Sequence, residues 1–250
     1  MTDLLLIGIG TGNPDHLTTE ARRAIAEADL ILLPEKGAGK SDLADLRRQI
    51  IAEVTDCPPP IATFEMPERD PELPYLQRVE AWHDMIADRW TTCLAEYAEA
   101  RRVALLVWGD PSLYDSTLRI AARLSPRPKI RVIPGITSLQ ALTAAHVIPL
   151  NTLGGPVTVT TGRRLRDQGW PKGAETIVVM LDGGCAFQTL DPSDLWIWWG
   201  AYLGMEEQIL CAGPLAEVGE DIIDRRAAAR AAHGWIMDTY LLRRGTSGLD

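Results

Sequence analysis

Residues 103–116 read VALLVWGDPSLYDS, an apolar run that ends in Gly-Asp-Pro and continues at once with an aromatic hydroxyl, a carboxylate and a Ser. Such a run is typical of a buried strand, and Gly-Asp-Pro is typical of a turn that leads into a helix. Two other segments have the same design: LLLIGI (4–9) runs into glycines, and IRVI (130–133) runs into PGITS. Helix-like segments separate the three, so the pattern predicts a mostly parallel sheet covered by helices.

Helical composition and spacing mark five segments of this first half. They are 18–30, 41–54, about 75–100, 112–124 and a segment that ends at 145. Beyond about residue 149 strand-like segments follow one another with less helix between them. They are 157–161, 176–181, 195–200, 208–213 and 235–242. The second half is therefore expected to be another α/β domain, with a mixed sheet.

The domain boundary is expected in IPLNTLGGP (148–156), where Pro and Gly cluster. We place an N-terminal α/β domain with a mostly parallel sheet over 1–148 and a C-terminal α/β domain with a mixed sheet over 149–244. The last residues, GTSGLD (245–250), are expected to be a disordered tail or a remnant of cloning.

The composition of the 250-residue chain is that of a soluble globular protein, with 46% hydrophobic and 24% charged residues. No run approaches the roughly 18 apolar residues that a membrane span needs. The start, MTDLLLIGIG, has no basic region before its apolar stretch, so we expect no signal peptide and a cytoplasmic location. The net charge of −9 opposes a sequence-independent grip on nucleic acid.

The four cysteines are scattered, without a CxxC pair or a nearby histidine at ligand spacing. They are Cys57, Cys93, Cys185 and Cys211. This spacing indicates neither a disulfide framework nor a zinc site, so we expect buried free thiols and no metal.

The glycines of GIGTGNP (8–14) nearly form a dinucleotide-binding fingerprint. The fingerprint requires G-x-G-x-x-G, which would place its third glycine at position 13, where this chain has Asn13. Asn13-Pro14-Asp15 also inserts a turn where the helix of that motif would begin. A nicotinamide-dependent dehydrogenase is therefore an alternative hypothesis that the spacing disfavours.

Three loops follow strands of the first half and should meet at the carboxyl edge of a parallel sheet, where open α/β folds bind ligands. They are 8–18, 108–116 and 133–138. Thr137 and Ser138 would offer hydroxyls, and backbone N–H groups at a helix start, to a carboxylate or a ribose. Asp110 would attract a cation, so the rim suits an amino acid sulfonium better than a phosphate. On local grounds alone, Gly-Asp-Pro is explained equally well as a plain connection between a strand and a helix.

The combination of LLLIGIGTGNPDHLT, WGDPSLYDS, VIPGITS and VVMLDG resembles the tetrapyrrole methylases, the S-adenosylmethionine-dependent enzymes of cobalamin and sirohaem biosynthesis. The resemblance spans nearly the whole chain. It implies two α/β domains with the active-site cleft between them, S-adenosylmethionine as cofactor and, because family members commonly pair, a homodimer.

Within the family, GDPSLYDST, PLNTLGGPVTVTTGRRL and RAAARAAHGWIMDTYLLRR most resemble a member that methylates precorrin-5 at ring carbon 1 and releases acetate. Two alternatives stay open. One is a sister precorrin methyltransferase that acts at another ring carbon, and the other is a methylase of a modified protein residue or of ribosomal RNA.

The resemblance also implies which residues bind the cofactor. They are Gly109, Asp110, Pro111, Leu113, Thr137, Ser138, Met180, Leu181, Ala212 and Gly213. It assigns the first glycine loop, with Gly10 and Gly12, to the substrate. Many relatives have Tyr-Gly-Arg or Tyr-Gly-Ser where this chain has Tyr114-Asp115-Ser116, a departure that places an extra carboxylate beside the reaction.

A precorrin carries many carboxylates, so an acidic protein needs a local group of arginines to receive it. Arg163, Arg164 and Arg166 form the densest basic cluster of the chain, with a solvated helix face as the equal alternative.

Release of an acetyl group would benefit from general acid–base help. The weak candidates are Asp15, His83, Tyr114 and Asp115. Among them, His83 is expected on the surface, and Asp15 is already explained by its place at a helix N-terminus.

Overall fold

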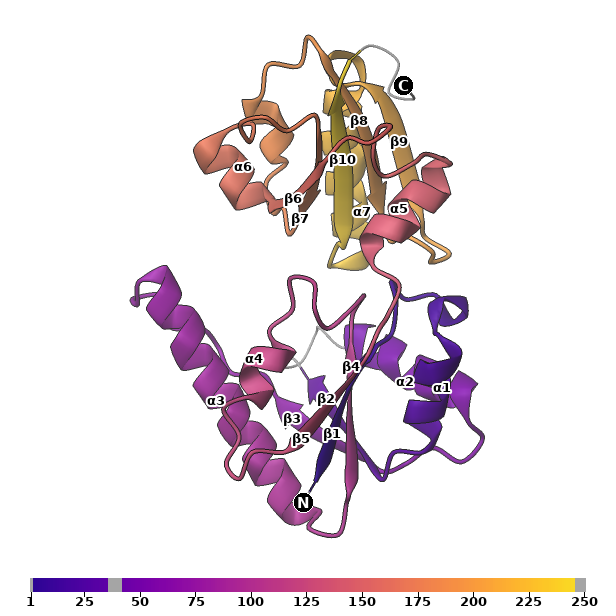
Figure 1. Cartoon of the computed structure of the whole chain (residues 1–250), viewed down its shortest axis with the longest axis vertical. Helices are drawn as coiled ribbons and strands as arrows, with labels where there is room; N and C mark the ends of the chain where they lie inside the picture. The colour runs from indigo at the N-terminus through magenta and orange to yellow at the C-terminus, as the bar shows by residue number, and fades with distance from the viewer. Residues whose placement is uncertain (1, 36–41, 246–250) are drawn as a thin grey trace. The chain divides into compact units, whose positions relative to one another are not determined.

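The computed structural model describes residues 2–35 and 42–245, and the chain divides into two compact units, Met1–Thr137 and Ser138–Asp250 (Figure 1). Each unit has its own sheet and its own core, which confirms the expected α/β architecture with two sheets. The division differs from the expected boundary at 148/149, because helix α5 (Ser138–His146) packs on strands of the second sheet. The expected tail falls on residues 246–250, outside the described part of the chain.

The first sheet has five strands, all parallel, in the order β3-β2-β4-β1-β5. Their bounds are β1 Asp3–Gly8, β2 Leu30–Glu35, β3 Ile61–Glu65, β4 Arg102–Val107 and β5 Lys129–Ile133. β3 has no counterpart in the sequence analysis, because it is a short edge strand that follows a run of prolines. The central strands β1 and β4 are apolar almost throughout, as strands covered on both faces must be.

Helices cover both faces of this sheet (Figure 1). α1 (Thr19–Ala26) and α2 (Asp42–Val54) pack on one face, and α3 (Tyr75–Glu96) and α4 (Thr117–Ala121) pack on the other. Alternate residues of β1 serve the two cores: Leu5 and Ile7 face α1 and α2, whereas Leu4 and Leu6 face α3 and α4. The period of two that a strand imposes therefore divides one apolar run between two cores.

α4 is much shorter than the expected helix over 112–124. The first residues of that segment form turns instead: the carboxylates of Asp110 and Asp115 each accept a hydrogen bond from the backbone N–H two residues on. Tyr114 has a left-handed backbone with φ 49°, which no helix tolerates. These side-chain-to-backbone bonds compete with helix formation until Thr117.

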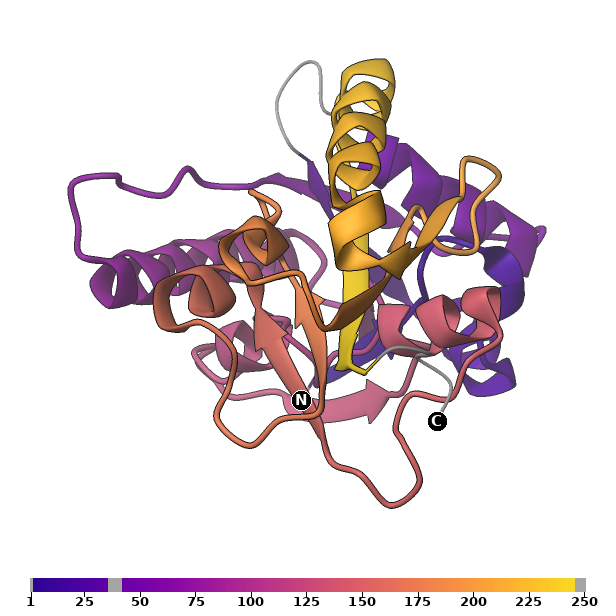
Figure 2. The ribbon, with the colours of Figure 1, turned by 90° about the horizontal axis from the view of Figure 1, so that it is seen from above.

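The second sheet is mixed, in the order β6-β7-β10-β8-β9, and only β6 and β7 run parallel. The strands are β6 Val157–Thr161, β7 Thr176–Met180, β8 Leu195–Ala201, β9 Ile209–Pro214 and β10 Asp238–Arg244. On one face the core contains residues of α6 (Gly162–Gln168) and α7 (Leu215–His233), the long helix beside β10 in Figure 2. The sequence analysis did not identify α7. α5 covers the other face, where Leu142 lies against Gly200 of β8.

Among the described residues, no helix is long and apolar enough to cross a membrane.

Candidate functional site

The three loops predicted to meet at one sheet edge do meet there. β1 lies between β4 and β5, and all three run parallel, so the loops that follow them leave the same edge. Two of the loops are joined by a short antiparallel bridge, in which Gly109 N donates to Gly10 O (2.7 Å) and Gly10 N donates to Gly109 O (3.3 Å). The prediction of a shared edge is confirmed.

Two glycines bring the backbones of these loops closer together than side chains would allow. A Cβ atom on Gly135 would lie 2.1 Å from Gly109 O and 2.8 Å from Gly8 Cα. A Cβ atom on Gly8 would lie 2.6 Å from Gly135 N. Because backbone atoms cannot give way as a side chain does, glycine is required at Gly8 and Gly135. The sequence analysis placed both residues in the predicted loops but did not single out either as a site residue.

Asp110 ties the Gly-Asp-Pro loop to the Pro-Gly loop. Its Oδ2 accepts a hydrogen bond from Gly135 N (2.9 Å), and its Oδ1 accepts from Ser112 N (2.8 Å) and from Ser112 Oγ. Burial acts to raise the pKa of Asp110, but the bonds from Ser112 and Gly135 outweigh it and hold the pKa below its ordinary value. The carboxylate stays charged at neutral pH and serves first as a link between two loops.

The remainder of the Gly-Asp-Pro loop differs in exposure from residue to residue. Pro111 is buried, Leu113 and Asp115 are partly buried, and the Tyr114 side chain is 42% exposed. Asp115 Oδ1 accepts a hydrogen bond from Thr117 N (2.6 Å) at the start of α4. Asp115, the carboxylate that many relatives lack, therefore helps to fix the turn before α4.

Arg47 of α2 lies beside the same loop and was not singled out in the sequence. Its guanidinium lies 4.9 Å from the ring centroid of Trp108 and donates from Nε to Leu106 O (3.1 Å). Burial lowers the pKa of Arg47 to about 10, and the carboxylate of Asp115 partly offsets that effect. The side chain therefore places a positive charge under the end of β4, near the carboxylate that departs from the pattern of many relatives.

The first glycine loop is not arranged as a dinucleotide site. After Gly10 and Gly12, which have positive φ angles of 73° and 115°, the chain forms a 3₁₀ helix, Pro14–His16, before α1 begins at Thr19. Asp15 is exposed in this turn, and its N–H donates to Asn13 Oδ1 (2.8 Å). The helix N-terminus that would receive a pyrophosphate in a dinucleotide fold is therefore displaced from the glycines.

His83 is buried, and the expectation that it lies on the surface is wrong. The buried stripe of α3 consists of His83, Ile86, Ala87 and Trp90, and His83 is 1% exposed. Neither ring nitrogen has a hydrogen-bond partner among the described residues. Burial lowers the pKa of His83, and the positive charge of Arg123 lowers it further, whereas Glu80 opposes both.

In the second unit, the predicted cofactor residues lie on two strands that are not neighbours. Met180 ends β7, and Leu181 follows it with a left-handed backbone (φ 52°) and a 66% exposed side chain. Ala212 and Gly213 lie in β9, which is separated from β7 by two strands, β10 and β8. Three strand spacings separate β7 from β9 by about 14 Å, so these two pairs do not touch. Ser138 is the first residue of α5.

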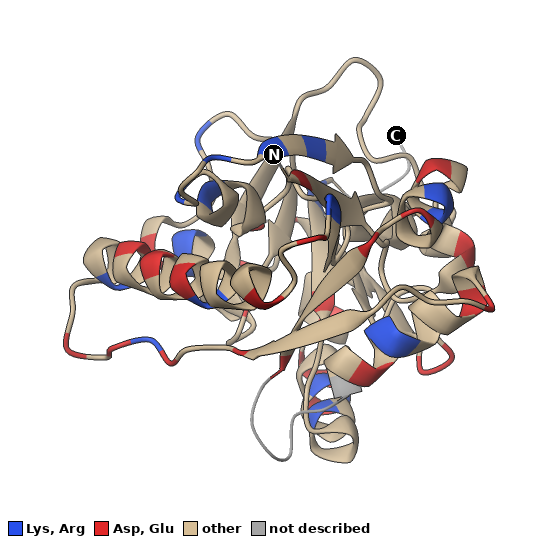
Figure 3. Ribbon diagram, turned by 90° about the horizontal axis from the view of Figure 1, so that it is seen from below, with Lys and Arg blue, Asp and Glu red and all other residues tan. Residues whose placement is uncertain are grey.

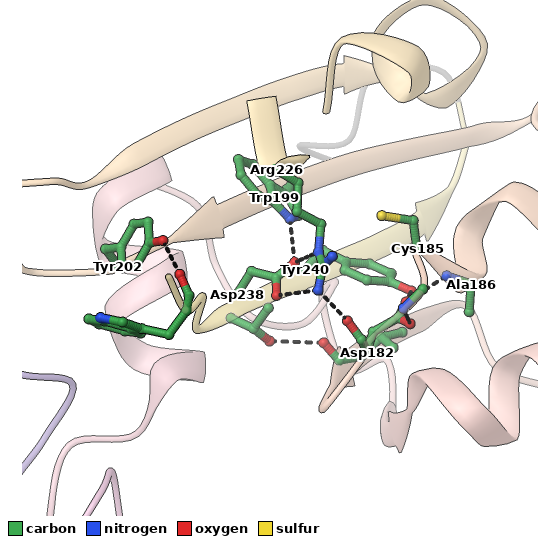
Figure 4. A network of polar contacts seen from close by, with 12 residues as sticks. Asp182, Cys185, Ala186, Trp199, Tyr202, Arg226, Asp238 and Tyr240 are labelled. Carbon is green, nitrogen blue, oxygen red and sulfur yellow. Dashed lines mark hydrogen bonds and ion pairs between the residues drawn. The ribbon is translucent and has the colours of Figure 1, made fainter. Parts of the chain in front are cut away.

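A buried polar network includes Asp182, the residue that follows Leu181 (Figure 4). Asp182 Oδ2 accepts hydrogen bonds from Tyr240 Oη (2.6 Å) and Ala186 N (2.6 Å), and Arg226 Nη2 donates to Asp182 O (2.9 Å). Arg226 is also paired with Asp238 (2.8 Å). Burial raises the pKa of Tyr240, so its hydroxyl remains a donor. The motifs VVMLDG and RAAARAAHGWIMDTYLLRR contain Asp182, Arg226, Asp238 and Tyr240, but the sequence analysis did not connect them.

The three arginines of the basic cluster begin α6 directly after β6, and all three are exposed. Arg166 pairs with Asp167 (2.9 Å), and Arg164 Nη2 reaches Gln168 Oε1 at 3.5 Å. Acidic and basic residues also occur together along α3, a solvated helix of mixed charge (Figure 3). Exposure fits both interpretations of the cluster, a substrate-binding group and a solvated helix face.

All four cysteines are free, as expected, but the expectation that they are buried is correct only for Cys185; Cys57 is exposed, and Cys93 and Cys211 are partly buried. Within residues 2–35 and 42–245, no three His, Cys, Asp or Glu side chains are grouped as a metal site would require.

Comparison with known proteins relates the chain to one family over most of its length. A family model of the tetrapyrrole (corrin/porphyrin) methylases matches residues 3–219. A precorrin-6A synthase (deacetylating) from a Sinorhizobium species is 49% identical over 252 residues, which cover 98% of this chain and 96% of that relative. A precorrin-2 C(20)-methyltransferase from Sinorhizobium is 30% identical over 176 residues, with 65% and 69% covered.

Solved structures agree with the sequence relatives. A cobalamin synthesis related protein (CobF) from Corynebacterium diphtheriae aligns with a TM-score of 0.82 and 38% identity, over 98% of this chain and 99% of that chain. The methyltransferase CobJ aligns with a TM-score of 0.62 at 19% identity, over 99% and 95%, which shows the shared fold. The dehydrogenase hypothesis is therefore wrong, in agreement with the geometry of the glycine loop. The chain belongs to the tetrapyrrole (corrin/porphyrin) methylases.

Proposed function

We propose that this protein transfers a methyl group from S-adenosylmethionine to ring carbon 1 of precorrin-5 and releases acetate, which gives precorrin-6A. One observation carries the proposal: the chain is 49% identical, over 98% of its length, to a precorrin-6A synthase (deacetylating). Likeness to the precorrin-2 methyltransferase is weaker and covers only 65% of the chain. The substrate is therefore assigned from the relative that matches end to end.

The cofactor assignment has support from the family and from the loops themselves. A uroporphyrin-III C-methyltransferase from Thermus thermophilus, which shares the fold, was solved in complex with S-adenosylhomocysteine. In this chain, the Gly10–Gly109 bridge and the bond from Gly135 N to Asp110 hold the three loops together at the carboxyl edge of the first sheet, where open α/β sheets bind ligands. We propose that the cofactor is held by Gly109, Asp110, Pro111, Leu113, Thr137, Ser138, Met180, Leu181, Ala212 and Gly213.

When bound, S-adenosylmethionine supplies a methyl group attached to a sulfonium sulfur. After transfer of the methyl group, the rest of the cofactor is a neutral thioether. The task of the chain is then to hold the nucleophilic ring carbon in line with that group, and such alignment can be worth about 7–11 kcal/mol. Precorrin carbons conjugated to a pyrrole nitrogen are enamine-like, so this step needs no dedicated base.

Release of the acetyl group makes a different demand on the chain. Water must add to the acetyl carbonyl, and the carbon–carbon bond must then break with its electron pair moving into the macrocycle. General acid–base help would speed that step. Asp15, Tyr114 and Asp115 lie in loops at the carboxyl edge of the first sheet and remain candidates, whereas buried His83 is the weakest of the four.

We propose a cytoplasmic homodimer whose small-molecule partner is precorrin-5, without nucleic acid or membrane. The family supports the dimer and the substrate, and the net charge and the apolar patterning of the sequence support the rest. We propose that Gly10, Gly12 and the arginines of α6 contact the substrate. Light scattering of the purified protein would test the dimer, for which a mass of twice 27.5 kDa is expected.

The identity of the substrate can be tested by anaerobic incubation of the protein with S-adenosylmethionine. Precorrin-5 and precorrin-2 are supplied in parallel reactions, and the mass of each pigment is measured over time. The proposal expects precorrin-5 to gain one methyl group and lose its acetyl group, and precorrin-2 to remain unchanged. A methyl group gained without loss of the acetyl group would identify a sister methyltransferase instead.

A further inference from the structure

The turn after β7 holds two residues in a conformation that side chains rarely adopt. Leu181 and Cys185 have φ angles of 52° and 55°, although neither is glycine, and they flank Gly183 and Gly184. A leucine in the left-handed region is strained, and such strain persists only where the surroundings impose it. Leu181 is also 66% exposed, so no core contact accounts for its conformation. Something adjacent to it must hold the turn.

Asp182 is the residue that holds it. Its side chain is 8% exposed, and its two oxygens accept three hydrogen bonds: from Tyr240 Oη, from Ala186 N and from Gly184 N (3.0 Å). Its carbonyl oxygen accepts a fourth, from Arg226. Both the backbone and the side chain of the residue after Leu181 are thus fixed, as Figure 4 shows.

The absence of a side chain at Gly162 leaves space for the Asp182 carboxylate. A Cβ atom on Gly162, the first residue of α6, would lie 2.3 Å from Asp182 Cγ. Behind the carboxylate, Asp238 pairs with Arg226 and accepts a hydrogen bond from Trp199 Nε1 (3.0 Å). Asp182 is therefore enclosed by α6, β10 and α7, and a change of its rotamer would break three hydrogen bonds of the carboxylate at once.

The position of the turn points to a ligand. β6 and β7 run parallel, and the turn leaves the carboxyl end of β7, the edge at which open α/β sheets bind ligands. A strained, exposed apolar residue at such an edge, fixed by a buried network, is typical of a pre-organised contact with a ligand.

We propose that Asp182 is a positioning residue for S-adenosylmethionine: its carboxylate, fixed by Tyr240, holds Leu181 in the left-handed conformation in which it contacts the cofactor. The inference rests on the proposed function. It assigns Asp182 no contact with the reacting atoms and no proton transfer. The Asp182 carboxylate raises the affinity for the cofactor, because binding does not then have to order the turn.

Two variants loosen the turn to different degrees. Tyr240→Phe removes one hydrogen bond from the Asp182 carboxylate and leaves the other contacts in place. Asp182→Asn turns one acceptor into a donor that faces N–H or O–H groups. Titration calorimetry with S-adenosylhomocysteine should give a Kd about threefold higher for Tyr240→Phe and about tenfold or more for Asp182→Asn. The kcat at saturating S-adenosylmethionine should stay close to that of the unmodified protein.

Thr176→Val is the matched control. Thr176 is fully buried at the opposite end of β7, and its hydroxyl accepts a hydrogen bond from Arg243 Nε (3.2 Å). Its loss should lower the Tm about as much as Tyr240→Phe does, because each change removes one buried hydrogen bond. It should leave the Kd for S-adenosylhomocysteine unchanged.

The outcomes separate the inference from the function on which it rests. An unchanged Kd in Tyr240→Phe and Asp182→Asn, together with a lower Tm, would show that the network only stabilises the second unit and would overturn the inference. An equal loss of affinity in Thr176→Val would overturn it as well. If Asp182→Asn does not fold, the test is the Kd for S-adenosylhomocysteine of Tyr240→Phe compared with that of Thr176→Val. Failure of the unmodified protein to bind S-adenosylhomocysteine would instead overturn the proposed function, and the inference with it.

Discussion

At Gly135, three backbone segments meet with no space for one more carbon atom. The nearest atom to a Cβ at this position is the carbonyl oxygen of Gly109, which is itself fixed by the bridge to Gly10. The loops at the carboxyl edge of the first sheet therefore depend on a contact between backbones as much as on any side chain.

Gly135→Ala should lower the free energy of unfolding by about 1–3 kcal/mol or more, because the clash is with backbone. Thermal unfolding measures that change, and S-adenosylhomocysteine binding should weaken with it. Gly219→Ala is the control, since its Cβ would lie 3.5 Å from Leu215 Cδ1 within α7 and should stabilise the helix by up to about 1 kcal/mol. Equal stability of the two variants would contradict this account of the glycine contact.

Single residues also show what the sequence can and cannot predict. The motif VWGDPSLYDS predicts a turn at Gly109-Asp110-Pro111 and a place at the sheet edge, and both are found. The bond from Gly135 N to Asp110 Oδ2 joins residues 25 positions apart, and no local pattern contains it. The contacts of Asp182 with Tyr240 and Arg226 were missed for the same reason.

Among the elements, α3 shows how periodicity can mislead. A stripe through Val79, Trp82, Ile86 and Trp90 and a stripe through His83, Ile86, Ala87 and Trp90 both have helical spacing, and sequence alone does not choose between them. Packing on the first sheet selects the second stripe. Trp82 is then only partly buried, and its ring lies 4.1 Å from the guanidinium carbon of Arg69.

Burial of His83 predicts that the first unit becomes less stable in mild acid. The folded-state pKa lies below the ordinary value of 6.5, so the unfolded chain binds the proton more readily. The stabilisation is complete above about pH 6.5 and is lost as the pH falls through that value toward the folded pKa. Arg123, Arg119 and Arg69 favour this direction, and Glu80 opposes it.

His83→Leu should remove the loss of stability in mild acid that comes from His83. Since neither ring nitrogen makes a hydrogen bond to a described residue, the substitution should change stability at pH 7 by less than about 1.5 kcal/mol. Chemical unfolding between pH 7 and pH 5 should then show a flatter dependence than in the unmodified protein. An unchanged slope would contradict the burial effect. Part of the slope should persist, because burial also lowers the pKa of His146.

The arginines of α6 allow a test of substrate binding. Replacing Arg163, Arg164 and Arg166 together by Gln should raise the KM for precorrin-5 about tenfold at low ionic strength and leave kcat nearly unchanged, because exposed charges act on binding and are screened by salt. Arg89→Gln on α3 is the matched control for an exposed arginine. A KM equal to that of the control would identify the cluster as a solvated helix face.

At the scale of the whole molecule, the alternation of strands and helices was sufficient to predict two α/β units, but not their division. α5 was assigned to the first domain because it follows β5 in a regular strand-and-helix alternation. Its partners, β8, β9 and β10, come much later in the chain, so local pattern does not reveal them.

Ligand protection tests the proposed cofactor on the intact protein, with NAD as the control ligand. S-adenosylhomocysteine at about one hundred times its Kd should stabilise the fold by about 2.7 kcal/mol and raise the Tm by about 5–10 °C, whereas NAD should have no effect. Thermal unfolding with each ligand measures the difference. Protection by NAD alone would contradict the assignment of the glycine loop.

The ratio of acetate released to methyl groups transferred is the most direct test of the proposed reaction. The purified protein, precorrin-5 and methyl-labelled S-adenosylmethionine would be incubated anaerobically, with acetate assayed and labelled pigment measured by mass spectrometry over the same time course. The account predicts one acetate for each methyl group transferred. Methyl transfer without acetate, or acetate without methyl transfer, would contradict it.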